Sequence, residues 1–394
     1  MTRLAGSSKL LRAMNESATL ALLLERGTLT RAELRELTGL SKPTTSDVLR
    51  TLTGVGFATV IGHTSGGPGP NAEIYAINPS AAHVAALSIR DVTETAHPAV
   101  GAALGDLTGN VLARAEYDLE PSDPITTVVS TVEDLCRRAG LDRGAVTHVQ
   151  LAVPGSYDPA GDTIRHIDVA GWNRPGLVSD LAGRLDTTVG AENDVNLAAI
   201  AERHRGVATG TEGFALLWFG AGLGCAIDLG DTLLRGVSGG AGELGYVPVG
   251  QSGKDLQDLV GGPAVLALAA EHGYHARTPE AAVAEAVSHV DGRARTPADP
   301  FLKELAERIA VALASVAAIL DPPLVVLAGE VAQAGGSVLR DLVAEAFHGA
   351  TPLRTPIAVT ALTDDAVLLG ALDAGLRAVR DSLIDSLRHA LAPA

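Results

Sequence analysis

Apolar positions in the first fifty residues recur at helical spacing. Residues 18–25 predict an apolar helix, and Thr30 with Glu33 has the spacing of a capping box that opens a second helix. Gly39 predicts a tight turn, after which Ser41 is placed to cap a third helix. Two short helices joined by a glycine turn predict a helix-turn-helix.

The pattern then changes to that of strands. Residues 57–61 and 73–77 read as two strands, and the Gly- and Pro-rich stretch 62–70 between them predicts a hairpin tip. A helix-turn-helix followed by a β-hairpin is typical of a winged helix, which we expect over residues 1–78 and call the head. The alternative is a small helical adaptor with a flexible loop.

Beyond Asn78-Pro79, which we interpret as a linker, strands and helices interleave, and this predicts an α/β fold. Apolar residues at helical spacing predict a long helix that ends at Asp321. The predicted strands cover 83–89, 99–104, 111–115, 146–153, 187–191, 214–219 and 324–328, and the predicted helices cover 125–139, 196–203 and 302–320.

The charge of the chain divides at the same boundary. The whole sequence has a formal charge of −16, but residues 1–78 contain eight basic and six acidic side chains, against 22 and 40 in the remainder. This excludes a protein that coats nucleic acid along its whole length. It indicates that the head alone binds double-stranded DNA. Because one head has so few basic groups, we expect it to bind as a dimer, which doubles the phosphate contacts.

The second helix of a helix-turn-helix enters the major groove with its N-terminal residues foremost. Basic side chains there suit phosphates or guanine edges, and small hydroxyls permit close approach to the backbone. Asp47 is unfavourable near phosphate unless it accepts a hydrogen bond from a cytosine amino group. The expected DNA contacts are Arg31, Lys42, Pro43, Thr44, Thr45, Ser46 and Arg50, with His63 from the hairpin.

Other classes of protein are disfavoured by composition. No apolar run reaches the roughly 18–20 uncharged residues that a membrane span needs, and no signal-peptide pattern opens the chain. The two cysteines, Cys136 and Cys225, suggest neither a disulfide framework nor a zinc cluster. We therefore expect a cytoplasmic protein.

Polar residues follow a predicted strand at Glu192-Asn193-Asp194. The carboxyl ends of strands in α/β sheets line the crevice where ligands bind, and an Asp there acts as a general base or accepts hydrogen bonds from a hydroxyl. The alternative is that Asn193 or Asp194 only caps the next helix.

A second candidate stretch is rich in glycine. Gly220, Gly222 and Gly224 follow a predicted strand, where backbone amides can approach a phosphate or a sugar closely, although a tight hairpin explains them equally well. Glu243 lies among further glycines and is well placed to accept hydrogen bonds from a polyol.

Together these stretches resemble the ROK family (repressor, open reading frame and kinase) over essentially the whole chain. The resemblance implies a winged helix joined to a two-lobed, actin-like kinase domain, which forms a dimer or tetramer. That domain covers 79–394, with one lobe at about 81–192 plus the C-terminal helix 365–394, and the other at about 193–364. The matching segments are residues 29–46 (helix-turn-helix), 192–196 (catalytic Asp), 220–224 (second phosphate loop), 239–249 (sugar-binding Glu) and 325–331 (nucleotide-side strand).

Two departures from the family bear on function. The family's kinases hold ATP phosphates in a loop with a glycine pair, whereas residues 87–98 lack that pair and include Glu94 and Pro98. Backbone amides cannot cradle a phosphate there, so we expect ATP not to bind and Asp194 to be a catalytic relic.

The family's zinc site is also missing. It takes a His where this chain has Tyr246, and cysteines from a loop that corresponds to residues 251–263 and contains none. We expect no metal and no cofactor. By the resemblance, the effector-binding residues are Asn193, Asp194 and Glu243, with Tyr246 and Gln257 as altered positions. The ligand is then an altered sugar, a sugar phosphate or another polyol.

Four further stretches or residues are weaker candidates for a functional role. We interpret Trp172 as a buried packing residue, and His166 and His204 as ordinary surface or core histidines. Residues 281–295 predict a solvated helix and linker.

Three functions remain to be distinguished. The leading hypothesis is a transcriptional repressor whose degenerate sugar-kinase-like domain senses a small polar effector. The second is a bifunctional sugar kinase that also binds DNA, and the third is an architectural repressor whose pocket has decayed.

Overall fold

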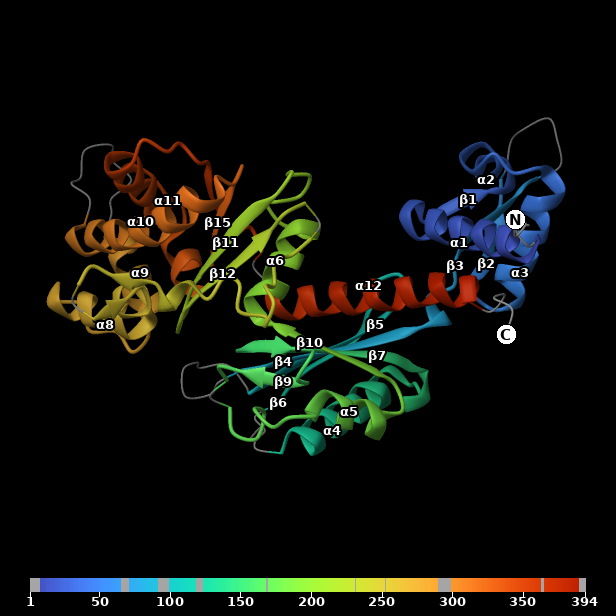
Figure 1. Cartoon of the computed structure of the whole chain (residues 1–394), viewed down its shortest axis with the longest axis horizontal. Helices are drawn as coiled ribbons and strands as arrows, with labels where there is room; N and C mark the ends of the chain where they lie inside the picture. Colours follow the sequence, from blue (N-terminus) through green and yellow to red (C-terminus); the bar gives the residue numbers. More distant parts are fainter. Residues whose placement is uncertain are drawn as a thin grey trace, which may run out of the picture.

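The computed structural model describes residues 8–64, 71–90, 99–117, 123–167, 169–230, 232–251, 253–289, 299–362 and 365–389. These residues form a small head and two larger lobes, and one long C-terminal helix runs between the head and the junction of the lobes (Figure 1). No described helix is both long and apolar enough to cross a membrane.

The head combines three helices with a small antiparallel sheet. Its helices are α1 (Ser8–Arg26), α2 (Arg31–Thr38) and α3 (Lys42–Gly54), and its strands β1 (Thr28–Thr30), β2 (Ala58–His63) and β3 (Glu73–Ile77) lie in the order β1-β3-β2. The capping box of Thr30 and Glu33, the left-handed turn at Gly39 and the Ser41 cap are all present. Helix α1 begins ten residues before the predicted start.

The first lobe contains a five-stranded mixed sheet. Its strands are β4 (His83–Ile89), β5 (Val100–Asp106), β6 (Val111–Tyr117), β7 (Val146–Val153) and β10 (Thr188–Asn193), in the order β10-β7-β4-β5-β6. Helices α4 (Pro124–Ala139) and α5 (Leu177–Leu185) cover one face, and α12 (Ala366–His389) packs on the other. Trp172, completely buried in the core with α4 and α5, is the packing residue that the sequence predicts. A short hairpin, β8 (Ser156–Asp158) and β9 (Thr163–Arg165), projects beyond β7.

The second lobe contains a four-stranded sheet between two helical layers. The strand order is β12-β11-β15-β16. Helix α6 (Asp194–Arg205) packs on one side and α10 and α11 on the other, with α7, α8 and α9 beyond them. The bounds are β11 (Phe214–Phe219), β12 (Leu223–Asp228), β15 (Val325–Ala328), β16 (Ile357–Val359), α7 (Gln257–Val260), α8 (Gly262–Glu271), α9 (Pro279–Ser288), α10 (Pro300–Leu320) and α11 (Glu330–Ala350).

One prediction for the second lobe is wrong. Helix α9 buries Ala282, Val283 and Ala286 in the core of the lobe, so it is a packed helix rather than a solvated one; residues 290–298 lie outside the described residues. The short elements are three 3-10 turns (Pro79–Ala81, Arg143–Ala145 and Leu244–Tyr246) and the strand pair β13 (Pro248–Val249) and β14 (Lys254–Asp255).

Helix α12 connects the parts of the molecule. Its first half packs on α6 and on the sheet of the first lobe, and its second half packs against α1 of the head. Leu376 and Val379 share a buried cluster with Leu20 and other core residues of the head. The hydroxyl of Ser17 in α1 also donates to the carbonyl of Ile384, at 3.2 Å. The helix assigned by sequence to the first lobe thus also packs against the head.

Candidate functional site

A large cavity lies between the two lobes and has a volume of about 670 Å³. It opens where β4, β7, β10, β11 and β15 end, at the edge of the sheets where α/β proteins bind ligands. Both lobes and the N-terminus of α12 contribute to its walls. We call it the cleft.

Asn193 and Asp194 line this cleft, and Asn193 also caps α6, of which Asp194 is the first residue. The Oδ1 atom of Asn193 accepts from the backbone amide of Asn196 at 3.1 Å, and its Nδ2 donates to the carbonyl of Gly155 at 3.2 Å. An oxygen of Asp194 accepts from the amide of Val195 at 2.8 Å. The capping role considered from the sequence is therefore real, and it fixes both side chains at the cleft.

The environment of Asp194 alters its acidity. The pKa of this carboxyl is raised to about 7, mainly by desolvation; the negative charges of Glu330 and Glu243 also raise the pKa, and hydrogen bonds from backbone amides, that of Val195 above all, lower it. A carboxyl that titrates near neutral pH is suited to accept or release a proton there.

Glu243 reaches the cleft from the second lobe. The hydroxyl of Ser156, in the first lobe, donates to its Oε1 at 2.5 Å, so this contact joins the lobes. Tyr246 follows one turn later, lines the cleft and is 62% exposed. Its ring faces that of His166 in the first lobe, with ring centroids 5.8 Å apart. His166 is therefore a cleft residue, whereas His204 lies exposed on α6 away from the cleft.

The glycine stretch forms the turn of a hairpin. Strands β11 and β12 pair as antiparallel neighbours from Phe214 to Asp228, and the amide of Gly220 donates to the carbonyl of Gly222 at 3.1 Å. Gly222 and Gly224 line the cleft. A side chain at Gly224 would collide with Val195 of α6, at 2.5 Å. The hairpin interpretation is thus confirmed, and two of the three glycines also face the cleft.

Gln257 has a different position from the one expected of an effector-binding residue. It is not among the residues that line the cleft. Its Oε1 accepts from the amide of Leu223 at 2.8 Å, and its side chain packs beside Gly245 and Gly261. Gln257 supports the β11–β12 hairpin from behind, so we leave it out of the proposed set.

Arg90 fills the region that follows β4. Its guanidinium lies over Gly101, where a Cβ atom would come within 2.6 Å, and it forms an ion pair with Asp365 at the start of α12 and another with Glu116, at 3.6 Å. The rest of the loop whose sequence departs from the ATP-binding pattern, residues 91–98, lies outside the described residues. In the described part, Arg90 and its ion-pair partners Asp365 and Glu116 occupy the space after β4.

The residues at the family's zinc positions do not fit zinc. Tyr246 offers a phenol, and the described part of 251–263 contains no thiol. No group of three or more His, Cys, Asp or Glu side chains within the described ranges is arranged to hold a metal ion. Both cysteines are buried and free.

In the head, Lys42 and Pro43 are exposed at the start of α3, and Thr44 and Ser46 are half-buried beside them. Thr45 is different. It is 2% exposed, and its hydroxyl donates to the carbonyl of Ser41 at 3.1 Å, so it belongs to the core of the head and we leave it out of the proposed DNA contacts.

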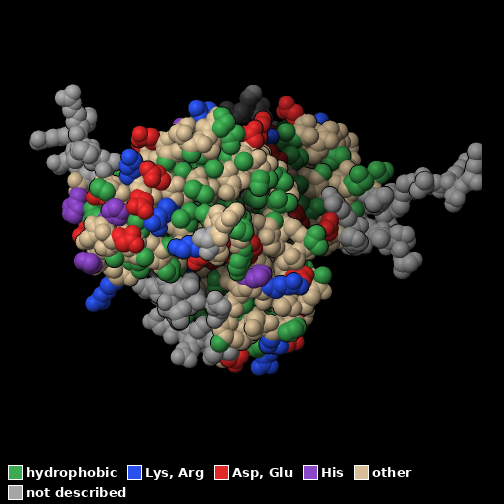
Figure 2. Space-filling model, turned by 60° about the vertical axis from the view of Figure 1, so that its left-hand side comes forward, with side chains coloured by type: hydrophobic (Ala, Val, Ile, Leu, Met, Phe, Trp, Pro, Cys, Tyr) green, Lys and Arg blue, Asp and Glu red, His purple; other side chains and the backbone are tan. Residues whose placement is uncertain are grey.

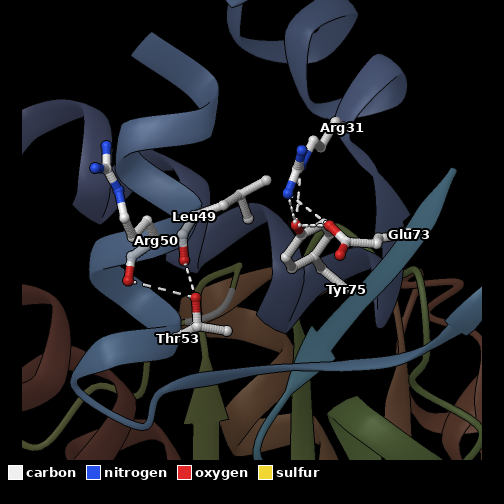
Figure 3. A network of polar contacts seen from close by, with 6 residues as sticks. All are labelled: Arg31, Leu49, Arg50, Thr53, Glu73 and Tyr75. Carbon is white, nitrogen blue, oxygen red and sulfur yellow. Dashed lines mark hydrogen bonds and ion pairs between the residues drawn. The ribbon is translucent and has the colours of Figure 1, made fainter. Parts of the chain in front are cut away.

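The arginines of the head are largely paired. Figure 3 shows Arg31 of α2 held against β3, where it donates to the hydroxyl of Tyr75 at 2.9 Å and to the carboxylate of Glu73 at 2.5 Å. Arg50, exposed on α3, forms an ion pair with Asp47. In the same view Thr53 closes the last turn of α3 by donating to the carbonyl of Leu49. Among head side chains that the structure describes, Lys42 and Arg35 carry a positive charge with no ion pair.

The face of the molecule in Figure 2 shows no broad basic surface. On this face basic and acidic side chains are interspersed, and the visible coloured atoms form no broad basic area. His63, at the end of β2, adds an exposed side chain on the head.

Sequence reasoning missed several cleft residues. Glu330 is the first residue of α11 and follows the buried strand β15 almost directly. This position after a predicted strand could have identified it as a cleft residue from the sequence. Arg90, Glu116 and Asp365 left no such signal, because they come together from three distant segments.

Comparison with known proteins gives these features a context. The sequence profile of the ROK family matches residues 97–376. The xylose repressor of Bacillus subtilis is 23% identical over 243 residues, which is 61% of this chain and 62% of the repressor. The bifunctional enzyme NanE/NanK of Brucella suis is 35% identical over 203 residues, 49% of this chain and 36% of that enzyme.

Two solved structures share the fold. A ROK family transcriptional regulator, a homologue of the E. coli MLC protein, aligns with 96% of this chain and 99% of its own at a TM-score of 0.75 and 18% identity. The ROK hexokinase of Thermus thermophilus aligns with 76% of this chain and 99% of its own at a TM-score of 0.61 and 25% identity. The regulator aligns over the head and both lobes, and the kinase over a smaller share of the chain.

Proposed function

The chain belongs to the ROK family, and from that premise we propose that it is a sugar-responsive transcriptional repressor that binds DNA through its head. We infer that α2, α3 and the β2–β3 hairpin form a winged helix-turn-helix, with α3 as the helix that enters the major groove. Similarity to xylose repressors and to a regulator of the same overall fold supports this choice.

One helix carries the proposal. Asp365, just before α12, and the first two residues of the helix, Ala366 and Val367, line the cleft, and later residues of α12 pack into the core of the head. A regulator needs such a connection, because an effector changes DNA affinity only through a difference that both sites sense. A coupling of about 1–3 kcal/mol between cleft and head changes DNA affinity by roughly 5- to 150-fold.

The cleft supplies the sensor. Asn193, Asp194 and Glu243 offer an amide and two carboxylates to a polyol, and the lobes that carry them are joined by the contact between Ser156 and Glu243. We propose that a sugar binds there, and that two heads of a homodimer or homotetramer are thereby moved relative to each other.

Footprinting on DNA upstream of the protein's own coding region tests this proposal. We expect a protected, palindromic site whose protection changes when the bound sugar is added. The variant Lys42→Ala removes an unpaired cation from α3 and should weaken protection at every sequence. Absence of any protected site across salt concentrations would overturn the proposal.

A sugar kinase that also binds DNA is the second candidate. The pKa of about 7 for Asp194 favours it, because this side chain corresponds to the catalytic base of the family and can take up a proton at neutral pH. The arginine and ion pairs after β4 oppose it, because they occupy space next to the expected phosphate loop. ATP-dependent release of ADP with any of a panel of sugars would favour the kinase.

A further inference from the structure

Three helices begin at the cleft. The first residue of α6 is Asp194, that of α11 is Glu330, and α12 starts directly after Asp365; all three side chains line the cleft. The N-terminus of a helix has unpaired backbone N–H groups and the positive end of the helix dipole, so it attracts an anion. Three such ends in one cleft favour an anionic group there, whether a ligand or the chain itself provides it.

In this chain the carboxylates at the helix ends provide the negative charge. The Oδ1 atom of Asp194 accepts from the amide of Val195 at 2.8 Å, and that of Asp365 accepts from the amide of Leu368 at 3.0 Å. Both aspartates are thus held by the first turn of their own helix. Glu330 differs, because its carboxylate reaches a neighbouring element.

Glu330 reaches the glycine turn between β11 and β12. The residue before it, Gly329, has a φ of 86° and lies so close to Phe219 that a Cβ atom there would overlap the carbonyl oxygen, which fixes the start of α11 on the end of β11. The Oε2 atom of Glu330 lies directly against Gly220: a Cβ atom at position 220 would collide with this oxygen and would come within 3.0 Å of Nε1 of Trp218. The carboxylate therefore lies on the backbone of the turn that the sequence marks as a candidate phosphate loop.

A carboxylate at this position and a phosphate group exclude one another. Both are anions that the N-terminus of α11 attracts, they need the same space, and like charges at short range in a partly buried site repel strongly. The charge of Glu330 is already sensed inside the cleft. Desolvation is the main cause of the raised pKa of Asp194, and the charge of Glu330 contributes to it more than that of Glu243.

We propose that Glu330 is an internal substitute for the phosphate group of a ligand: its carboxylate occupies the anion position between the N-terminus of α11 and the glycine turn, and it keeps nucleotides and other phosphate-bearing compounds out of that end of the cleft. The inference goes beyond the proposed function, because it assigns a specificity-determining role to one side chain whichever ligand the rest of the cleft binds. Removal of this single carboxylate should turn the position into a site for an external anion.

Calorimetric titration of the full-length protein with inorganic phosphate, pyrophosphate and ATP, without magnesium, tests this role. Glu330→Ala removes the carboxylate and leaves its space open, so we expect it to bind at least one probe about tenfold more tightly than the wild type, or better. Glu330→Gln removes the charge but fills the space, so its gain should be smaller, about threefold. Equal binding of all three probes by the wild type and both variants would overturn the proposal.

Glu345→Ala is the matched control. Glu345 is an exposed carboxylate on the same helix and is not among the residues that line the cleft, so this variant should bind the probes like the wild type.

Thermal unfolding gives a second readout. Pyrophosphate should raise the Tm of Glu330→Ala and leave those of the wild type and Glu345→Ala nearly unchanged, because a ligand stabilises the folded state that binds it. Equal shifts in the three proteins would contradict the role of Glu330. If Glu330→Ala does not fold, the isosteric Glu330→Gln decides: its titration must show the gain, and its absence overturns the proposal.

The probes contain neither the free sugar nor DNA, so this inference and the proposed function can fail separately. If Glu330→Ala gains anion binding but no sugar changes DNA binding by the wild type, the role of Glu330 stands and the sugar-responsive repressor is refuted. If a sugar changes DNA binding but neither variant gains anion binding, the repressor stands and the role of Glu330 is refuted.

Discussion

Gly370 of α12 lies directly against the carbonyl of Leu197 in α6, so close that a Cβ atom at position 370 would overlap that oxygen. Both helices begin in the cleft, α6 with Asp194 and α12 beside Asp365. Backbone contact at this crossing means that α6 and α12 cannot shift independently. Since α12 continues to the head, we propose that a change in the cleft reaches the head through this crossing.

The variant Gly370→Ala should therefore impair both stability and communication. A methyl group forces the helices apart, which we expect to cost about 1–3 kcal/mol, as overpacking of a core does. The change in DNA affinity on addition of the sugar should shrink while sugar affinity is largely kept. Urea unfolding and DNA titrations with and without sugar measure the two effects.

Gly349→Ala is a matched control for that substitution. Gly349 lies in α11 with open space around its Cβ position, so alanine should leave communication intact and stabilise the helix by about 0.5–1 kcal/mol. Equal sugar responses from Gly370→Ala and the wild type would contradict a role for the crossing.

The raised pKa of Asp194 predicts a pH dependence of stability. Its pKa is about 7 in the folded protein against 3.8 ordinarily, so between about pH 4 and 7 the folded chain holds a proton that the unfolded chain has released. Stability from this group is therefore present at low pH and is lost as pH rises through that window. Asp194→Asn, which cannot ionise, should gain stability relative to the wild type on going from pH 5 to pH 8.

Thermal or urea unfolding at the two pH values checks that prediction. Glu36→Gln, a surface carboxylate of the head, serves as the control and should show no comparable gain. A difference between Asp194→Asn and wild type that stays constant with pH would show that Asp194 is ionised at pH 5.

Under the proposed function, ion pairing within the head limits its attraction for DNA. Asp47→Asn removes the partner of Arg50 on the exposed side of α3. We expect the variant to bind DNA more tightly. The slope of log affinity against log salt concentration should be steeper by about one unit, as for one added phosphate contact. Glu36→Gln makes the same charge change without freeing an arginine, so its effect should be smaller. Loss of affinity in Asp47→Asn would instead indicate that Asp47 contacts a base.

Two arginines near the end of α6 differ in their contribution to stability. Arg203 and its partner Asp228 are less than 10% exposed, and Arg203 also donates to the carbonyl of Thr211. Arg203→Ala leaves a buried carboxylate unpaired and should cost about 3–5 kcal/mol. Arg205→Ala, which breaks a more exposed pair with Asp373, should cost about 0–1 kcal/mol. Equal losses in urea unfolding would contradict this difference.

The sequence predicted the framework because its signals are local. All seven predicted strands beyond residue 79 are present within two residues at each end, since each is a buried apolar run bounded by turn residues. The cap at Ser41 and the capping box at Thr30 depend only on neighbours in the chain. Asn193, Asp194 and Glu243 were found because they directly follow or adjoin such signals.

Other features depend on contacts that no local pattern contains. Arg90 and Asp365 are 275 residues apart in the chain, so their pairing follows only from the fold. The left-handed conformation of His166 likewise occurs where the backbone passes close to Gly155, a contact that only the fold creates. Thr45 was open to prediction: it precedes Val48 and Leu49 by three and four residues and shares their buried face.

The proposed function depends most on one relationship, that between the cleft and DNA binding. Fluorescence anisotropy of operator DNA, titrated with the wild type and with Glu243→Ala in the presence and absence of the sugar that binds, measures it directly. We predict a change of roughly 5- to 150-fold in DNA affinity for the wild type and no change for the variant. Identical DNA affinity for the wild type with and without the bound sugar would contradict the account.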